Sequence, residues 1–175
     1  MRPAVDIEVD DGTGVWTTDG LPMVYIPRHF MLGIHDSVER ALGRERYRDV
    51  LTESGAGSAY FWCKQQAAAR GLDGVAVFEH YLARLSTRGW GQFTLEDAAF
   101  ARGTATIRLV NSIYVLGRSA EAEHPVCYMF EGFIVGGLTY LAEDKGLGFS
   151  SITCREVQCQ ALGDAACRFE ASLNP

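Results

Sequence analysis

Four of the five cysteines lie in the last third of the chain, and their spacing constrains the fold more than any other feature. Glu156, Cys159 and Cys167 form the pattern E-x2-C-x7-C, and Gly163-Asp164 between the two cysteines is typical of a hairpin turn. Such a hairpin brings Cys159 and Cys167 face to face, and a small kink would turn Glu156 to the same spot. Thiolate and carboxylate groups that converge in this way are typical zinc ligands.

A tetrahedral zinc site needs a fourth ligand from another part of the chain. Cys127 is the first candidate because Pro125 suits the first turn of a helix, where the backbone dipole favours a thiolate. Cys154 and His124 are alternative fourth ligands. Cysteine also packs often as a small buried hydrophobic residue, so the spacing alone leaves a purely structural role open.

Length and composition limit the class of protein. The 175 residues suit one hydrophobic core, and 47% hydrophobic with 22% charged residues is an ordinary globular balance. A net charge of -6 argues against nucleic acid and anionic membranes as partners. The acidic first ten residues argue against a signal peptide, and no apolar run is long enough for a membrane span. We therefore expect a cytoplasmic protein with reduced thiols, in which metal binding is favoured over disulfides.

Apolar residues recur at helical spacing in the first half of the chain. The pattern predicts helices over about residues 30–42, 44–53, 58–70 and 73–87, with a break at 54–57. Residues 1–20 are predicted to be an irregular extension, followed by a short strand over 23–26.

The pattern changes to alternation after Gly89. It predicts a strand around 93–95, a strand within 104–115, a helix over 125–143 and a hairpin over 149–173. We expect an N-terminal extension over 1–22 and a single α+β domain over 23–175. In that domain an antiparallel sheet packs with helices, and a metal site joins the C-terminal hairpin to a helix N-terminus.

Two segments resemble the vinyl reductase-type (4-vinyl reductase) domain. Residues 125–133 (PVCYMFEGF) resemble its start, and residues 155–168 (REVQCQALGDAACR) resemble its end. The domain occurs in bacteriochlorophyll-pathway proteins and as the sensor of phenol- and xylene-responsive activators, and a related fold occurs in vesicle-tethering subunits. The resemblance covers about residues 100–172.

The resemblance implies a set of metal ligands. In the activators, zinc is held by the cysteine of the first motif and by the glutamate and both cysteines of the hairpin. Carried to this sequence, the ligands are Cys127, Glu156, Cys159 and Cys167. Four protein ligands close the coordination sphere, which makes the zinc structural, whereas iron in its place would indicate a redox role.

Related domains also bind small molecules between their helices and their sheet. The phenol sensors carry a tryptophan three residues before a serine, where this chain has Leu109, so phenol itself is not the expected ligand. We expect a mostly hydrophobic ligand with one hydrogen-bonding group, because a bare charge would lack compensation there. Aromatic residues at helical spacing are also typical of a core. The predicted ligand-binding residues are Phe78, His80, Tyr81, Leu109, Ile113 and Phe130.

The sequence thus favours a binding module with a sensor or accessory role and no catalytic residue. One alternative is a reductase or accessory enzyme in tetrapyrrole or one-carbon metabolism. This alternative follows from the family name alone. Residues 13–22 (TGVWTTDGLP) resemble a proteobacterial family of unknown function found near genes for methylated-amine breakdown, which points to a pathway and not to a reaction. Another alternative is a protein-interaction scaffold. A homodimer is expected because the helix over 125–143 is apolar on more than one face.

Overall fold

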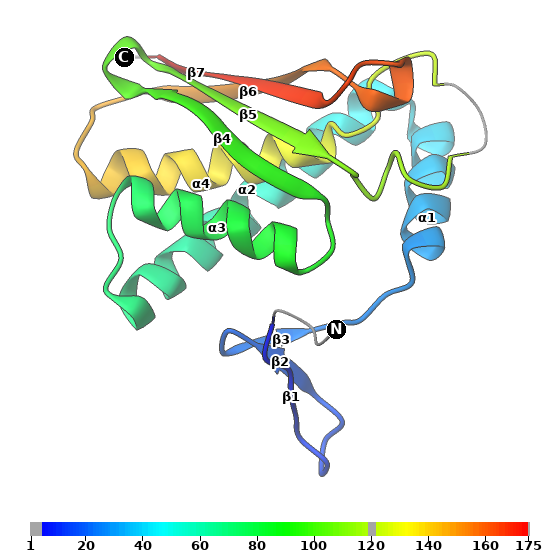
Figure 1. The fold of residues 1–175 in the computed structure, drawn as a ribbon, viewed down its shortest axis with the longest axis horizontal. Helices are drawn as coiled ribbons and strands as arrows, with labels where there is room; N and C mark the ends of the chain where they lie inside the picture. Colours follow the sequence, from blue (N-terminus) through cyan, green and yellow to red (C-terminus); the bar gives the residue numbers. More distant parts are fainter. Residues whose placement is uncertain (1–4, 119–121, 175) are drawn as a thin grey trace.

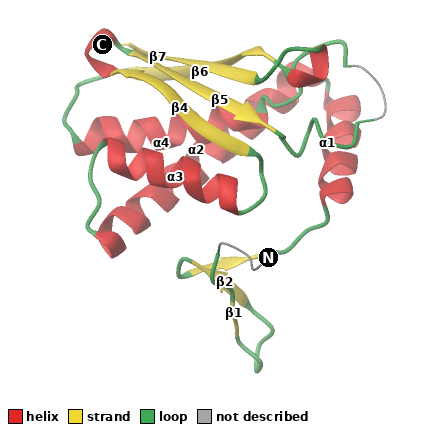
Figure 2. Ribbon diagram, in the orientation of Figure 1, coloured by secondary structure: helices red, strands yellow, loops and turns green. Residues whose placement is uncertain are grey.

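The computed structural model describes residues 5–118 and 122–174. A four-stranded antiparallel sheet is covered on one face by helices, and a small three-stranded sheet lies near the N-terminus (Figures 1 and 2). The helices are α1 (Arg28–Leu42), α2 (Arg44–Arg70), α3 (Val75–Thr87) and α4 (Met129–Asp144). The strands are β1 (Glu8–Val9), β2 (Trp16–Thr18), β3 (Leu21–Met23), β4 (Gln92–Ala99), β5 (Thr104–Val110), β6 (Ser151–Gln158) and β7 (Cys167–Asn174). The predicted α+β class with an antiparallel sheet is confirmed.

The large sheet has the strand order β4-β5-β7-β6, so the C-terminal hairpin β6–β7 pairs with β5. Along β7 buried and non-buried residues alternate, as expected for a strand with one face on the core. Cys167, Phe169 and Ala171 face the helices, while Glu170 is exposed on the opposite face. Leu109 of β5 pairs with Cys167 of β7, which places the end of β5 beside the cysteine hairpin.

Helix α2 is continuous, and the predicted break at residues 54–57 is wrong. The reason is close packing against α4 (Figure 1). A Cβ atom on Gly55 would lie 3.0 Å from the Phe133 ring and 3.3 Å from the Phe133 backbone nitrogen. Gly55 therefore serves a helix contact, and the stabilisation from tertiary packing outweighs its low helix propensity.

Helix α4 lies between α2 and the sheet, and this explains why it is apolar on several faces (Figure 1). A Cβ atom on Gly132 or Gly136 would lie only 2.6 or 2.1 Å from backbone oxygens of α2. The two glycines therefore permit a close helix contact within the chain. The helix also begins at Met129, four residues later than the predicted start at Pro125.

The predicted irregular N-terminal extension instead contains the antiparallel strands β1, β2 and β3 from Glu8 onward, while residues 1–4 lie outside the described part. The predicted strand over 23–26 is replaced by β3, which ends at Met23. Strand β5 ends at Val110, so Ile113 and Val115 follow it in a loop. Within the described residues, no helix combines the length and the hydropathy that a membrane crossing requires.

Helix α1 contacts the rest of the chain through an unusual residue. Its one buried side chain is His35, which lies against the rings of Tyr47, Tyr114 and Tyr128 at centroid distances of 5.4, 4.5 and 5.1 Å. Neither ring nitrogen has a hydrogen-bond partner in the described structure, and a Glu39 carboxylate oxygen lies 3.8 Å away. Burial lowers the pKa of His35 to about 4. Glu39 and Asp36 oppose the shift, and Arg118 and His124 add to it.

This burial predicts a pH-dependent stability. The unfolded chain binds a proton at His35 below about pH 6.5, whereas the folded chain does so only near pH 4. The contribution of the neutral, buried His35 to the free energy of unfolding is therefore fully present above pH 6.5, and it is lost as the pH falls from 6.5 to 4. The loss in the free energy of unfolding is on the order of 3 kcal/mol.

Urea unfolding of the parent and of the His35→Phe variant across this pH range measures the effect. The variant keeps an aromatic ring but has no proton to bind, so its stability should fall less steeply than that of the parent. Other titrating groups affect both proteins and cancel in the difference. Parallel stability curves would contradict a buried neutral His35.

Candidate metal centre and ligand pocket

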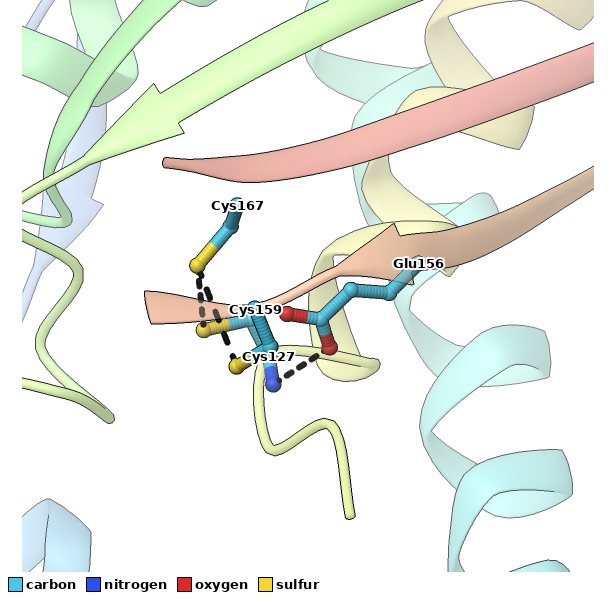
Figure 3. A group of neighbouring side chains, drawn as sticks. All are labelled: Cys127, Glu156, Cys159 and Cys167. Carbon is cyan, nitrogen blue, oxygen red and sulfur yellow. Dashed lines mark hydrogen bonds between the residues drawn. The ribbon is translucent and has the colours of Figure 1, made fainter. Parts of the chain in front are cut away.

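Four side chains from three parts of the chain converge at one end of the sheet (Figure 3). Glu156 comes from β6, Cys159 follows β6, Cys167 begins β7, and Cys127 precedes α4. Their candidate ligand atoms all lie within 4.8 Å of one another, and all four residues are buried. The structure thus brings together the four predicted ligands and joins the C-terminal hairpin to the start of a helix.

A β-bulge makes this convergence possible. Residues three apart on a regular strand point to opposite faces, so Glu156 and Cys159 would normally diverge. The β6–β7 register shifts between Glu156 and Gln158, which leaves Val157 without a pairing partner. The extra residue turns the end of β6 so that both side chains face the same site. This bulge is the kink that the sequence interpretation required.

The distances between the ligand atoms fit a tetrahedral metal. The Cys127 and Cys167 sulfurs are 3.7 Å apart, and the Cys167 and Cys159 sulfurs are 4.0 Å apart. Zinc–sulfur bonds of about 2.3 Å at tetrahedral angles place two sulfurs about 3.8 Å apart. The Glu156 Oε1 atom is buried and has no hydrogen-bond partner in the described structure, while Oε2 accepts the Cys127 N–H at 2.8 Å. One carboxylate oxygen is therefore free to bind a metal.

The electrostatics of the cluster reflect its burial. Desolvation, followed by the effect of Cys159, raises the pKa of Glu156 to about 9. Burial also raises the pKa of the Cys127 thiol, while hydrogen bonds from Cys127 and Cys167 lower the pKa of Cys159 to about 2. Burial in the protein alone thus opposes ionisation of the Glu156 carboxyl and the Cys127 thiol. A bound cation would favour the release of the remaining protons.

Glu131 supports the cluster and was not identified from the sequence as a functional residue. It is a buried carboxylate in the otherwise apolar helix α4. It accepts the Glu156 N–H at 2.9 Å and pairs with Arg48 and Arg155 at 3.2 and 3.1 Å. Glu131 therefore fixes the backbone of a candidate ligand. The sequence feature that could have identified Glu131 is its position as an acidic residue inside an apolar helical segment.

The alternative ligands lie elsewhere. Cys154 is buried on β6 outside the cluster, and His124 binds Glu39 at 2.9 Å. Arg155 and Arg168 flank the candidate ligands in sequence and could offset their negative charge. Instead Arg155 pairs with Glu131, and Arg168 lies 3.5 Å from Glu170. Ser112 lies close to the site, because its hydroxyl oxygen accepts a hydrogen bond from the Cys127 thiol at 3.1 Å.

The predicted ligand-binding residues are not gathered around one described cavity. Phe78, Leu109 and Phe130 have no exposed surface, and Ile113 is buried in the same core. A mainly apolar pocket of about 320 Å³ lies beside them, and Tyr81 alone of the predicted set lines it. His80 stacks on Trp62 at 5.5 Å. The pocket residues are Leu21, Pro22, Met23, Ser58, Phe61, Trp62, Tyr81, Leu85, Arg88, Trp90 and Phe133.

Three solved structures share the fold at low sequence identity. The phenol-responsive sensory domain of the transcription activator PoxR, solved with phenol, has a TM-score of 0.75 at 18% identity, covering 95% of this chain and 84% of that chain. A trafficking protein particle complex subunit 3 from Naegleria fowleri, covalently bound to palmitic acid, has a TM-score of 0.59 at 12% identity. The match covers 85% of this chain and 95% of that chain. A vinyl-4-reductase family protein from Methanocaldococcus jannaschii has a TM-score of 0.56 at 18% identity. The match covers 87% of this chain and 85% of that chain.

These similarities confirm the fold of a 4-vinyl reductase-type domain. No curated protein matches the chain in sequence. A family model does match the N-terminal part of the chain. It covers residues 1–96, more than half of the chain, and is described as a domain of unknown function (DUF5943). The chain belongs to that family, whose region includes the small N-terminal sheet and helices α1 to α3.

Proposed function

We propose that the protein is a cytoplasmic, zinc-stabilised binding domain for a small, mostly hydrophobic molecule, with a sensor or accessory role. The observation that carries the binding function is the pocket of about 320 Å³, whose lining is mainly aromatic and aliphatic. The PoxR domain of similar fold, which was solved with phenol, adds support by analogy.

Zinc is the proposed metal because of the donor set. Three cysteines and one carboxylate suit zinc, and a cytoplasmic location would keep the thiols reduced. Four protein ligands leave no open position, so the proposed role is structural: the metal ties the β6–β7 hairpin to the start of α4. When bound, zinc would supply the positive charge that lets the buried thiols ionise.

The metal proposal predicts about one zinc per chain and a clear contrast between cysteine variants. Cys159→Ser should lose most of the metal and at least about 3 kcal/mol of stability, because the binding energy contributes to folding. Cys63→Ser should keep the metal, because Cys63 is buried in α2 away from the cluster. Elemental analysis and thermal unfolding measure the two effects.

A second pair of variants separates the ligand set from its alternative. Cys127→Ser should lose metal, whereas Cys154→Ser should keep it, although both side chains are buried. Equal metal content in these two variants, or a folded parent without metal that was never exposed to chelator, would refute the assignment. Iron in place of zinc would point to a redox role.

The binding proposal predicts that a neutral aromatic probe, phenylnaphthylamine, binds once per chain in the apolar pocket. Ser58 of α2 lines this pocket, so Ser58→Trp should fill it and weaken binding at least about ten-fold. The control is Ser37→Trp, on the exposed side of α1, which should change the affinity little. Fluorescence titration measures both variants, and equal affinities would contradict this site.

We also propose a homodimer, through a surface different from the one expected from the sequence. The segment between β3 and α1 exposes consecutive apolar side chains, with Val24 at 77% and Tyr25 at 83% exposure. Phe30 and Ile34, one turn apart in the helix α1 that follows, are also exposed, at 55% and 39%. We call Val24, Tyr25, Ile26, Phe30 and Ile34 the linker–α1 surface. Exposed apolar residues that lie this close together in the chain are typical of interfaces, and a second copy is the proposed partner.

Light scattering at micromolar concentration tests the dimer. The expected mass is twice the 19.2 kDa of one chain. The double variant Tyr25→Ser, Phe30→Ser should be monomeric, because it removes the two most exposed aromatic side chains of the linker–α1 surface. Leu147→Ser, at an exposed apolar position after α4, should stay dimeric. A monomeric parent would contradict the proposal.

A further inference from the structure

The small N-terminal sheet is held on the helices by one carboxylate. Asp19 lies in the turn between β2 and β3 with a φ angle of 55°. Its oxygens accept hydrogen bonds from Arg84 at 2.9 Å, from Arg88 at 2.5 Å and from Arg70 at 3.3 Å. Gln66 also donates to the Asp19 carbonyl oxygen at 3.0 Å. We call Asp19 with its three arginines the arginine latch.

The latch has more positive than negative charge. Three guanidinium groups surround one carboxylate, and the Arg88 and Asp19 side chains are only 10% and 4% exposed. Burial alone would raise the pKa of Asp19, but Arg84 and Arg88 outweigh it and lower the pKa. Asp6 and Glu8 line a polar cavity beside the latch, yet neither forms an ion pair with these arginines in the described residues. These carboxylates offset part of the positive charge of Arg70 and Arg84, which line the same cavity, whereas Arg88 does not line it.

Arg88 connects the latch to the apolar pocket. It lines the pocket, and its guanidinium carbon lies 5.3 Å from the centre of the Trp62 ring. One nitrogen of Arg88 binds Asp19, but Nε is buried and has no hydrogen-bond partner among the described residues. The Trp62 indole N–H is buried and unpaired in the same way. Buried donors without partners are uncommon in folded proteins and indicate unused binding capacity.

We propose that this pocket binds a flat apolar molecule that carries one carboxylate or similar oxyanion. In the structure, the Asp19 carboxylate occupies the place on Arg88 that this anion would take. The inference rests on the proposed function and adds the chemical class of the ligand. It also reverses the expectation that a charge in the pocket would lack compensation, because Arg88 provides it.

The same geometry couples binding to the N-terminal sheet. Leu21, Pro22 and Met23 of β3 form one wall of the pocket, and only Gly20 separates them from Asp19 in the chain. An anion on Arg88 competes with Asp19 and weakens the contact that holds the turn. A ligand in the pocket therefore weakens the attachment of β3 to the helices. The linker–α1 surface follows β3 in the chain.

Two fluorescent probes that differ in one charged group test the proposal. Anilinonaphthalene sulfonate has the rings of phenylnaphthylamine together with a sulfonate. Arg88→Gln should weaken sulfonate binding at least about ten-fold and change phenylnaphthylamine binding less than about two-fold. Asp19→Asn should strengthen sulfonate binding, because it removes the competing charge while asparagine tolerates the positive φ angle. Arg102→Gln, a charge change at an exposed arginine, should affect neither probe.

The outcomes separate the inference from the proposed function. If phenylnaphthylamine binds but Arg88→Gln affects both probes equally or neither, the anion proposal fails and the apolar site stands. If phenylnaphthylamine does not bind the parent, the apolar site fails and the anion proposal fails with it. If Arg88→Gln does not fold, Asp19→Asn decides, since unchanged or weaker sulfonate binding overturns the proposal.

Discussion

The close contact between α2 and α4 is the constraint on which the rest of the structure depends. Gly132 and Gly136 leave no space for a Cβ atom against the α2 backbone, so the two helices meet along their main chains. This contact holds α4 between α2 and the sheet, with its N-terminal end beside the β6–β7 hairpin. Cys127 and Glu131 reach the cluster because α4 lies there.

Most of the candidate metal-ligand cluster was predictable because three of its four residues lie close together in sequence. The E-x2-C-x7-C spacing places Glu156, Cys159 and Cys167 on one hairpin, and the family resemblance supplied Cys127. The helical periods also gave α1 and α3. The division of α2 was wrong because a glycine-rich stretch normally ends a helix, and here a contact between residues about 80 positions apart reverses that tendency.

The N-terminal sheet and the pocket were harder to predict for the same reason. Strands β1 to β3 have two or three residues each, too few for a periodic pattern. Their position depends on Asp19, whose partners Arg70, Arg84 and Arg88 are about 50 to 70 residues away. Since β3 forms a wall of the pocket, a sequence interpretation that treats it as an extension places the cavity in the core. There, Phe78 and Leu109 are fully buried.

Four buried or half-buried carboxylates of this chain differ in how their charge is balanced, and the difference supports a metal. Asp19 has three arginines, and Glu131 has two. Glu39 binds His124 and the Tyr128 hydroxyl. Glu156 has no basic side chain within ion-pair distance in the described part of the chain, and it lies among three cysteines. Without a cation, burial therefore keeps the proton on Glu156, as its raised pKa indicates, and a bound cation would favour the ionised carboxylate. The missing charge is the one that zinc would supply.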